Sequence, residues 1–272
     1  METMTQGHNL TLPVYNLQIS YDDVGEGSIP VIFLHGYPFD KSMWQGQLDF
    51  LQKTHRLIAI DIRGFGKSTD EESYLSMDTF GNDLMQFMDK LGLEKAIICG
   101  LSMGGYIALN VVKRFPEKFK ALILCDTQCI ADTPEAKTKR FKTIGSIDVD
   151  GVEDFLEGFI KNVFHQNSLT DKKEVVEELR TVVYANSKHI IKQGLVALAE
   201  RNETCSTLGN IKMPTLILCG REDKVTPLEQ SEFMHEAIKG SVLHVIDEAG
   251  HVSNLEQPEV FNKHLLNFLN WI

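Results

Sequence analysis

The sequence predicts an α/β protein with a mostly parallel, eight-stranded sheet and helices on both faces. Short apolar runs with the length of buried strands alternate with segments whose apolar residues recur at helical spacing. This alternation stops over residues 127–210, which hold several helical patterns and no strand-like run, and then resumes. We therefore expect a core formed by residues 1–126 and 211–272, with residues 127–210 inserted after the sixth strand as a helical lid.

The expected strands fall into two groups. The first two, residues 9–14 and 17–24, form a pair in which the second strand alternates only weakly, so we place the pair at the sheet edge. The others are nearly continuous apolar runs typical of a buried parallel sheet, at residues 30–34, 57–60, 96–99, 121–125, 214–219 and 241–246.

Helical spacing of apolar residues predicts the helices of the core and of the lid. In the core they lie at residues 43–52, 78–91 and 258–271, with a further helix ending near residue 238. In the lid they lie at residues 149–164, 172–184 and 189–199. The last core helix should bury one apolar face, made of Val260, Phe261, Leu265, Leu266, Phe268 and Leu269.

Composition narrows the class of protein and its partners. The chain has 272 residues, 43% hydrophobic and 24% charged, which suits one large α/β domain with an insertion. No apolar run approaches the roughly 18 residues of a membrane span, and residues 1–11 lack the apolar core of a signal peptide. A net charge of −11 disfavours nucleic acid as a partner. We expect neither a nucleic-acid nor a membrane partner.

The cysteines give no sign of a metal or redox site. Cys99, Cys125 and Cys219 each close an apolar strand-like run, so we expect them to be reduced core residues. The five cysteines show no metal-ligand spacing. We therefore expect a reducing, cytoplasmic location and no metal or cofactor.

The chemistry centres on the motif Gly100-x-Ser102-x-Gly104, which stands between a strand-like run and a helical segment. A serine on a sharp strand-to-helix turn needs small residues two positions before and after it, because bulk there would clash with the neighbouring strand and helix. The turn exposes the Ser102 hydroxyl and aims the N-terminus of the new helix at it. Such a serine is a candidate nucleophile, and it requires a histidine and an acid downstream.

The candidate base is His251, which follows the last expected strand by one short loop. His35 also follows a strand, but its place before the tight turn at Gly36 suits a structural role. Two residues compete for the acid. Asp223 follows the strand after the insertion, and its 28-residue separation from His251 leaves room for one helix and one strand. Asp126 follows the strand before the insertion, and we favour Asp223.

Three other carboxylates that follow strands, Asp61, Glu222 and Asp247, are expected to stabilise the loops on which they lie. The order Ser102, Asp223, His251 is the serine–acid–histidine order of the α/β-hydrolase fold. The chain resembles that superfamily from about residue 17 to its C-terminus. The motifs that carry the resemblance follow one another in order: His35-Gly36-Tyr37-Pro38, Asp61-x-Arg63-Gly64-x-Gly66-x-Ser68, Gly100-x-Ser102-Met103-Gly104-Gly105, Gly220-x-x-Asp223 and Gly250-His251.

Within the superfamily, the elbow motif and residues 126–135 resemble the branch of 3-oxoadipate enol-lactonases, small carboxylesterases and cofactor-free haloperoxidases. The resemblance implies an oxyanion hole made by the backbone N–H groups of Tyr37 and Met103, with the Tyr37 side chain as pocket wall. It implies no cofactor. Substrate contacts are not carried over to the lid.

The leading hypothesis is a serine hydrolase that cleaves a small soluble ester or lactone through an acyl-enzyme. Hydrolysis of a carbon–carbon bond, or perhydrolysis of the haloperoxidase kind, would use the same residues, and a ligand receptor that keeps the fold is a third alternative. The lid should offer an apolar underside and limit the acyl chain to about eight carbons. Early lid cations either form a solvated helix face or meet a substrate carboxylate: Lys137, Lys139, Arg140 and Lys142.

Overall fold

A computed structural model describes residues 6–70 and 74–272. These residues form one 8-stranded sheet in the order β1-β2-β4-β3-β5-β6-β7-β8. β2 runs antiparallel to β1 and β4, and the other neighbours are parallel. The predicted fold class is confirmed, as is the edge position of the first pair. The strands are β1 (Gly7–Val14), β2 (Leu17–Val24), β3 (Val31–Leu34), β4 (Leu57–Ile60), β5 (Ala96–Leu101), β6 (Phe119–Cys125), β7 (Thr215–Gly220) and β8 (Val242–Ile246).

Helices cover both faces of the sheet, as the alternation of patterns predicts. The helices of the core are α1 (Gln45–Leu51), α2 (Met77–Lys90), α3 (Met103–Arg114), α9 (Leu228–Ala237), α10 (Ser253–Glu256) and α11 (Pro258–Trp271). Three short 3₁₀ helices lie in connections between strands and helices: η1 (Lys41–Trp44), η2 (Pro116–Lys118) and η3 (Cys205–Asn210).

Neighbouring residues of β3 show how the two faces are packed. Side chains alternate across a strand, so Phe33 and Leu34 point to opposite faces. Phe33 packs on Trp44 with ring centroids 5.0 Å apart, and Trp44 packs on Phe261 of α11 at 6.3 Å. Leu34 instead faces Phe80 of α2, which packs against α3. Both faces of the strand are therefore buried, which explains its unbroken apolar sequence.

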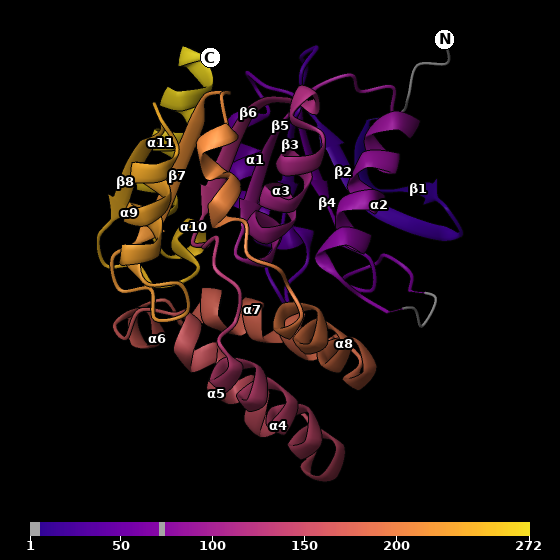
Figure 1. Cartoon of the computed structure of the whole chain (residues 1–272), viewed down its shortest axis with the longest axis vertical. Coiled ribbons are helices and arrows are strands. Elements are labelled where there is room, and N and C mark those ends of the chain that lie inside the picture. The colour runs from indigo at the N-terminus through magenta and orange to yellow at the C-terminus, as the bar shows by residue number, and fades with distance from the viewer. Residues whose placement is uncertain (1–5, 71–73) are drawn as a thin grey trace.

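The segment between β6 and β7 is helical and lies at one end of the sheet. Figure 1 shows its helices gathered below the sheet. These lid helices are α4 (Pro134–Asp150), α5 (Glu153–Val163), α6 (Ser168–Asp171), α7 (Lys173–Tyr184) and α8 (Lys188–Ala199).

Two helical predictions are wrong in detail. The helix expected at residues 149–164 is split, because Gly151 has a φ of 93° and caps α4 before α5 begins. The long α4 itself was not predicted, since only Ile147 of its residues is buried and its apolar pattern is weak. Val260 does not face inward, and 43% of it is exposed at the start of α11.

The cysteines divide into three thiols and one disulfide. Cys99, Cys125 and Cys219 are buried and free, as the sequence predicts. Cys129 and Cys205 form a disulfide that joins the segment before α4 to η3 after α8. No sequence pattern indicated this pair. Disulfides are rare in reducing compartments, so the pair weighs against the cytoplasmic location, which remains a prediction.

Among residues 6–70 and 74–272, no helix has both the length and the apolarity to cross a membrane. The first five residues of the polar N-terminal stretch lie outside the described residues.

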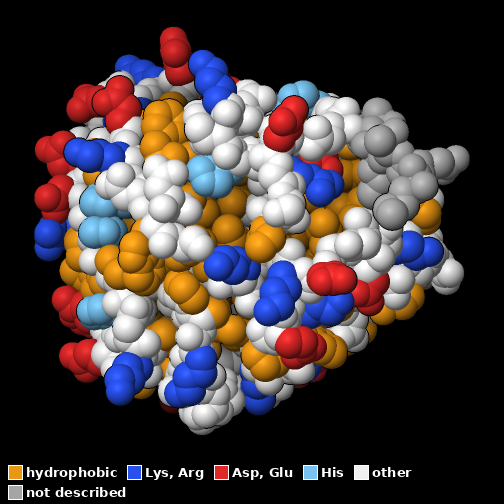
Figure 2. Space-filling view, turned by 90° about the horizontal axis from the view of Figure 1, so that it is seen from above, with side chains coloured by type: hydrophobic (Ala, Val, Ile, Leu, Met, Phe, Trp, Pro, Cys, Tyr) orange, Lys and Arg blue, Asp and Glu red, His pale blue; other side chains and the backbone are white. Residues whose placement is uncertain are grey.

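Seen from above in Figure 2, the face of the molecule carries lysines, arginines and carboxylates interspersed with hydrophobic side chains. The charges on this face are therefore mixed in sign and not gathered into one patch.

Candidate active site

Ser102 stands on the strained turn that the sequence predicts between β5 and α3. Its φ of 53° and ψ of −113° lie outside the favoured regions for a residue with a side chain. The turn is tight: a Cβ on Gly100 would lie 2.3 Å from the backbone carbon of Gly104. A Cβ on Gly104 would lie 2.2 Å from the backbone oxygen of Leu34 in β3. Both positions therefore admit only glycine.

The three residues proposed as nucleophile, base and acid meet in one chain of hydrogen bonds. His251 Nε2 lies 2.8 Å from Ser102 Oγ, and His251 Nδ1 lies 2.8 Å from Asp223 Oδ2. All three side chains are at least nine-tenths buried. They come from the loops that follow β5, β7 and β8, which are parallel strands and so end at the same edge of the sheet.

The loop after β7 fixes the orientation of Asp223. The backbone N–H groups of Val225 and Thr226 donate to Asp223 Oδ1 at 2.8 and 3.0 Å. The Thr226 hydroxyl donates to Asp223 Oδ2 at 2.7 Å and lies 3.3 Å from His251 Nδ1. Thr226 was missed in the sequence, although its place three residues after the acid allows a local turn of this kind.

The pKa shifts of His251 and Asp223 suit a histidine base that is paired with a carboxylate. Burial alone would lower the pKa of His251, but the charge of Asp223 and the hydrogen bond to it prevail and raise the pKa above 6.5. Burial would raise the pKa of Asp223. The charge of His251, the hydrogen bond to it and the hydrogen bonds from Thr226 outweigh burial and lower this pKa below its ordinary value. Asp223 is therefore ionised wherever His251 is neutral.

Asp126, the competing acid, forms its hydrogen bonds with residues other than His251. Its Oδ1 accepts from Gly220 N–H at 2.8 Å, and its Oδ2 accepts from the Ser253 hydroxyl at 2.6 Å. Burial and the nearby charge of Asp223 raise the pKa of Asp126 to about 8. The structure therefore brings Asp223, and not Asp126, into contact with His251.

Glu256, which the sequence analysis missed, holds the histidine loop to the lid. It is fully buried, and its two carboxylate oxygens accept from Gly250 N–H and His165 N–H, each at 2.7 Å. The backbone N–H of His251 donates to Val163 O, at the end of α5, at 2.7 Å. A buried glutamate in a short helix leaves no periodic signal by which sequence could have found it.

The backbone around the predicted oxyanion hole lies next to Ser102. Met103 is the first residue of α3, so its N–H belongs to the helix start and has no acceptor within the helix. Gly36, which precedes Tyr37, packs so closely that a Cβ there would lie 3.2 Å from Ser102 Cβ. The Tyr37 side chain is buried, donates its hydroxyl to Ile191 O at 2.8 Å and lines the pocket, as its predicted role as wall requires.

A cavity of about 580 Å³ opens over Ser102 and His251. Its volume falls within the range of small-molecule sites. The lid supplies its apolar part through Phe155 and Phe159 of α5 and Leu195 and Leu198 of α8, the residues that the sequence proposed for the lid underside. These side chains come from different lid helices, so the cavity exists only with the lid in place.

Comparison with known proteins agrees with this geometry. The family model of the alpha/beta hydrolase fold matches residues 29–258. The chain belongs to this family. It is 30% identical over 253 residues to the 3-oxoadipate enol-lactonase 2 of Acinetobacter baylyi, covering 93% of each chain. It is 29% identical over 272 residues to the 2-hydroxy-6-oxononadienedioate/2-hydroxy-6-oxononatrienedioate hydrolase of Comamonas testosteroni, covering 93% of this chain and 92% of that one.

Among solved structures, a thermophilic esterase from Thermogutta terrifontis, studied with malate bound, superposes with a TM-score of 0.90 at 31% identity over 96% of both chains. The resemblance that the motifs indicate is therefore confirmed at the level of the family. Esterases and enol-lactonases are among the relatives of this α/β hydrolase.

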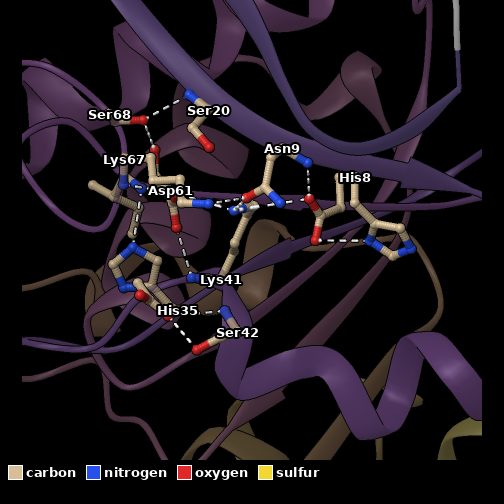
Figure 3. A network of polar contacts seen from close by, with 12 residues as sticks. His8, Asn9, Ser20, His35, Lys41, Ser42, Asp61, Lys67 and Ser68 are labelled. Carbon is tan, nitrogen blue, oxygen red and sulfur yellow. Dashed lines mark hydrogen bonds and ion pairs between the residues drawn. The ribbon is translucent and has the colours of Figure 1, made fainter. Parts of the chain in front are cut away.

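A buried polar network supports the Gly36–Tyr37 turn of this α/β hydrolase (Figure 3). Burial lowers the pKa of His35, so its ring is neutral, with Nδ1–H donating to Gly36 O at 2.8 Å and Nε2 accepting from Ile62 N–H at 2.9 Å. Asp61 accepts from the backbone N–H of Lys41 at 2.8 Å and pairs with its ammonium at 3.3 Å. His35 and Asp61 are therefore structural, as expected.

Positively charged side chains from α4 and from the loop after β7 line the cavity over Ser102. Lys139 and Arg140 of α4 and Lys224 of the acid loop all line it, with Asp154 as the carboxylate among them. Arg140 is paired with Asp132 at 2.5 Å. Lys139 and Lys224 are exposed, and no ion pair joins either to a described residue. Lys139 and Arg140 therefore line the cavity, and the choice between a solvated helix face and contact with a substrate carboxylate stays a prediction.

Among residues 6–70 and 74–272, one group of side chains has the composition of a metal site: Asp126, Cys219 and Asp223 bring ligand atoms within 4.8 Å of one another. The carboxylate oxygens are already bonded to N–H and O–H donors and to His251. Burial raises the pKa of the Cys219 thiol, whereas a metal would bind the thiolate. The group therefore does not fit a metal.

Proposed function

We propose that this α/β hydrolase is a serine hydrolase that cleaves a small carboxylic ester or lactone through an acyl-enzyme on Ser102. The observation that carries the proposal is the unbroken hydrogen-bond chain from Asp223 through His251 to Ser102, with 2.8 Å at each step. A serine hydroxyl is a weak nucleophile until a neutral base takes its proton, and this geometry supplies that base.

The reaction follows from the direction of these bonds. His251 Nε2 takes the proton as Ser102 Oγ attacks the carbonyl carbon, and Asp223 stabilises the imidazolium through Nδ1–H. The N–H groups of Tyr37 and Met103 stabilise the oxyanion, each by roughly 3 kcal/mol. His251 then protonates the leaving alcohol, and the ester bond to Ser102 is hydrolysed by a water that His251 deprotonates. No cofactor takes part.

The cavity suggests which substrate enters. Residues 127–210 act as a lid on the core of residues 1–126 and 211–272, and the apolar wall of α5 and α8 would receive a short acyl chain. Lys139 and Lys224 would attract a carboxylate on the same substrate. Such a role is consistent with the similarity to a 3-oxoadipate enol-lactonase.

Other reactions would use the same residues. Hydrolysis of a carbon–carbon bond also passes through an oxyanion next to Ser102, and similarity to the dienedioate hydrolase of Comamonas testosteroni keeps that alternative open. Perhydrolysis would replace the deacylating water by peroxide. A ligand receptor without turnover would have no need of the aligned hydrogen bonds at Ser102 and His251.

A hydrolysis screen tests the proposal. Methyl and p-nitrophenyl esters, with and without a distal carboxylate, and a set of lactones are compared at equal concentration. We expect turnover of short esters, with a lower KM for the carboxylate-bearing ones that rises in Lys139→Gln and Lys224→Gln. The matched control is Lys161→Gln, a lysine of α5 outside the cavity lining. Turnover of no ester or lactone would contradict the proposal.

A further inference from the structure

The end of α5 and the residues after it pack against the loop that carries the base. A Cβ on Gly250 would lie 2.8 Å from both Val163 O and His165 N, so the lid backbone leaves no room there for a side chain. The backbone N–H of His251 donates to Val163 O at 2.7 Å. Residues 163–165, the lid segment, therefore contact the histidine loop directly.

Glu256 joins the same two parts of the molecule through its side chain. It is the last residue of α10, and it is fully buried. Its Oε1 accepts from Gly250 N–H and its Oε2 accepts from His165 N–H, each at 2.7 Å. Lys172, between α6 and α7, adds a further link, because its ammonium donates to the backbone oxygen of Glu256. One carboxylate thus bridges the lid segment and the residue before the base.

The contacts of Glu256 suit an ionised carboxylate. Both oxygens accept backbone N–H groups, which stabilise the charged form. Burial raises the pKa of Glu256 above its ordinary value, while the hydrogen bonds from Ser168, His165 and Gly250 and the charge of the His165 ring oppose that rise. The carboxyl group therefore carries a negative charge where the lid meets the histidine loop.

This negative charge also acts on the base. Burial lowers the pKa of His251, and three carboxylates raise it: Asp223 in direct contact, then Asp126 and Glu256. Asp223 and Asp126 follow strands of the core, whereas Glu256 is bonded to the lid. Removal of the charge on Glu256 should therefore lower the pKa of His251.

We propose that Glu256 is a positioning residue for His251: it fixes the lid segment to the histidine loop, so that the lid holds the imidazole in line with Ser102. The inference rests on the proposed function, in which His251 is the base. His251 Nε2 lies 2.8 Å from Ser102 Oγ, and a displacement of about 1 Å at a reacting group costs about a hundredfold in rate. The lid then acts on the chemical step as well as on the size of the cavity.

Glu256→Gln tests the proposal, because the amide keeps the size of the side chain but turns an NH₂ group toward one of the two backbone donors. We expect kcat on a short p-nitrophenyl ester to fall about ten- to a hundredfold. KM should stay within about twofold, since residues 163–165 do not line the cavity over Ser102. Labelling with a fluorophosphonate, carried to completion, counts the folded sites, and kcat is expressed per site.

The matched control is Glu259→Gln, which removes an exposed carboxylate of α11 three positions later. It should behave as the parent does. A kcat per site in Glu256→Gln within about twofold of the parent value, or a loss confined to KM, would leave Glu256 a structural role only and overturn the proposal.

NMR titration of the His251 ring gives a readout that needs no turnover. We expect a lower ring pKa in Glu256→Gln than in the parent, and no change in Glu259→Gln. If the parent cleaves no ester, the proposed function fails, and this titration alone decides the role of Glu256. An unchanged ring pKa in Glu256→Gln would overturn the proposal.

A second pair of variants serves if Glu256→Gln does not fold. Lys172→Gln removes the link from the lid to the backbone oxygen of Glu256, and Lys173→Gln changes a neighbouring exposed lysine at the start of α7. We expect kcat per site to fall a few fold in Lys172→Gln and to stay at the parent value in Lys173→Gln. Equal kcat values in the two variants would overturn the proposal.

Discussion

The Ser253 hydroxyl donates a 2.6 Å hydrogen bond to Asp126 and so holds that carboxylate away from the imidazole of His251. Ser253 follows the base by two residues, and Asp126 directly follows β6, the strand next to β7. Asp126 thus ties the histidine loop to the loop of the acid through Gly220 N–H. It orders both loops, whereas Asp223 acts on His251 directly.

This division predicts different effects for two matched substitutions. Asp223→Asn should lower kcat by about ten-thousand-fold, because an amide favours the wrong imidazole tautomer and does not stabilise the imidazolium. Asp126→Asn should lower it less than about tenfold, since the amide still accepts from Gly220 N–H and neutral hydrogen bonds contribute about 1 kcal/mol each. Steady-state kinetics on one p-nitrophenyl ester checks both. A larger loss in Asp126→Asn would show that the acid is wrongly assigned.

Activity should rise with pH. His251 accepts the Ser102 proton only when it is neutral, and the charge of Asp223 raises its pKa above the ordinary 6.5. The acid limb of kcat/KM should therefore have its midpoint above that value. In Asp223→Asn, burial remains and the carboxylate charge is gone, so NMR titration of the His251 ring should give a lower pKa. An acid limb centred below pH 6 would be incompatible with this pairing.

The tight turn at Ser102 predicts an effect on stability. Gly104→Ala places a methyl group 2.2 Å from Leu34 O, and the backbone of β3 cannot yield without loss of sheet pairing. We expect a large fall in Tm or failure to accumulate folded protein. The matched control is Gly145→Ala in α4, where the new methyl meets nothing within 4 Å. It should stabilise the helix by about 0.5–1 kcal/mol. Equal Tm values for the two variants would contradict the packing argument.

Substrate size follows from the lid. The cavity of about 580 Å³ over Ser102 is bounded by the lid helices, so esters with about eight or fewer acyl carbons should react best. Competing p-nitrophenyl acetate, butyrate, octanoate and palmitate would give the order of kcat/KM. A preference for palmitate, with activation at a lipid–water interface, would exclude a closed lid.

The sequence alone predicted the site residues whose positions follow from local motifs and from the order of strands along the chain. The strand before Ser102 and the turn glycines are local signals, and each loop residue follows a strand that a buried parallel sheet must contain. Asp223 was favoured over Asp126 by its position, and the hydrogen bonds agree. The fold class follows from the same alternation of strands and helices.

Contacts between residues far apart in the chain could not be predicted from the sequence. Glu256 contacts His165 across 91 positions, and Cys129 meets Cys205 across 76, so neither pair leaves a periodic pattern. The lid helix α4 buries little, hence its weak apolar spacing. Val260 shares the helical spacing of its neighbours but stands at the margin of the buried face, a distinction that spacing alone does not make.

Replacement of Ser102 by alanine tests the central claim most directly. Ester hydrolysis and labelling by a fluorophosphonate probe are measured on the parent, on Ser102→Ala and on Ser28→Ala, a control at an exposed serine of the turn after β2. We predict that Ser102→Ala stays folded, loses activity by about a million-fold and takes no label, while Ser28→Ala behaves as the parent does. If Ser102→Ala retained more than about a tenth of the activity, the assignment of the nucleophile would be wrong.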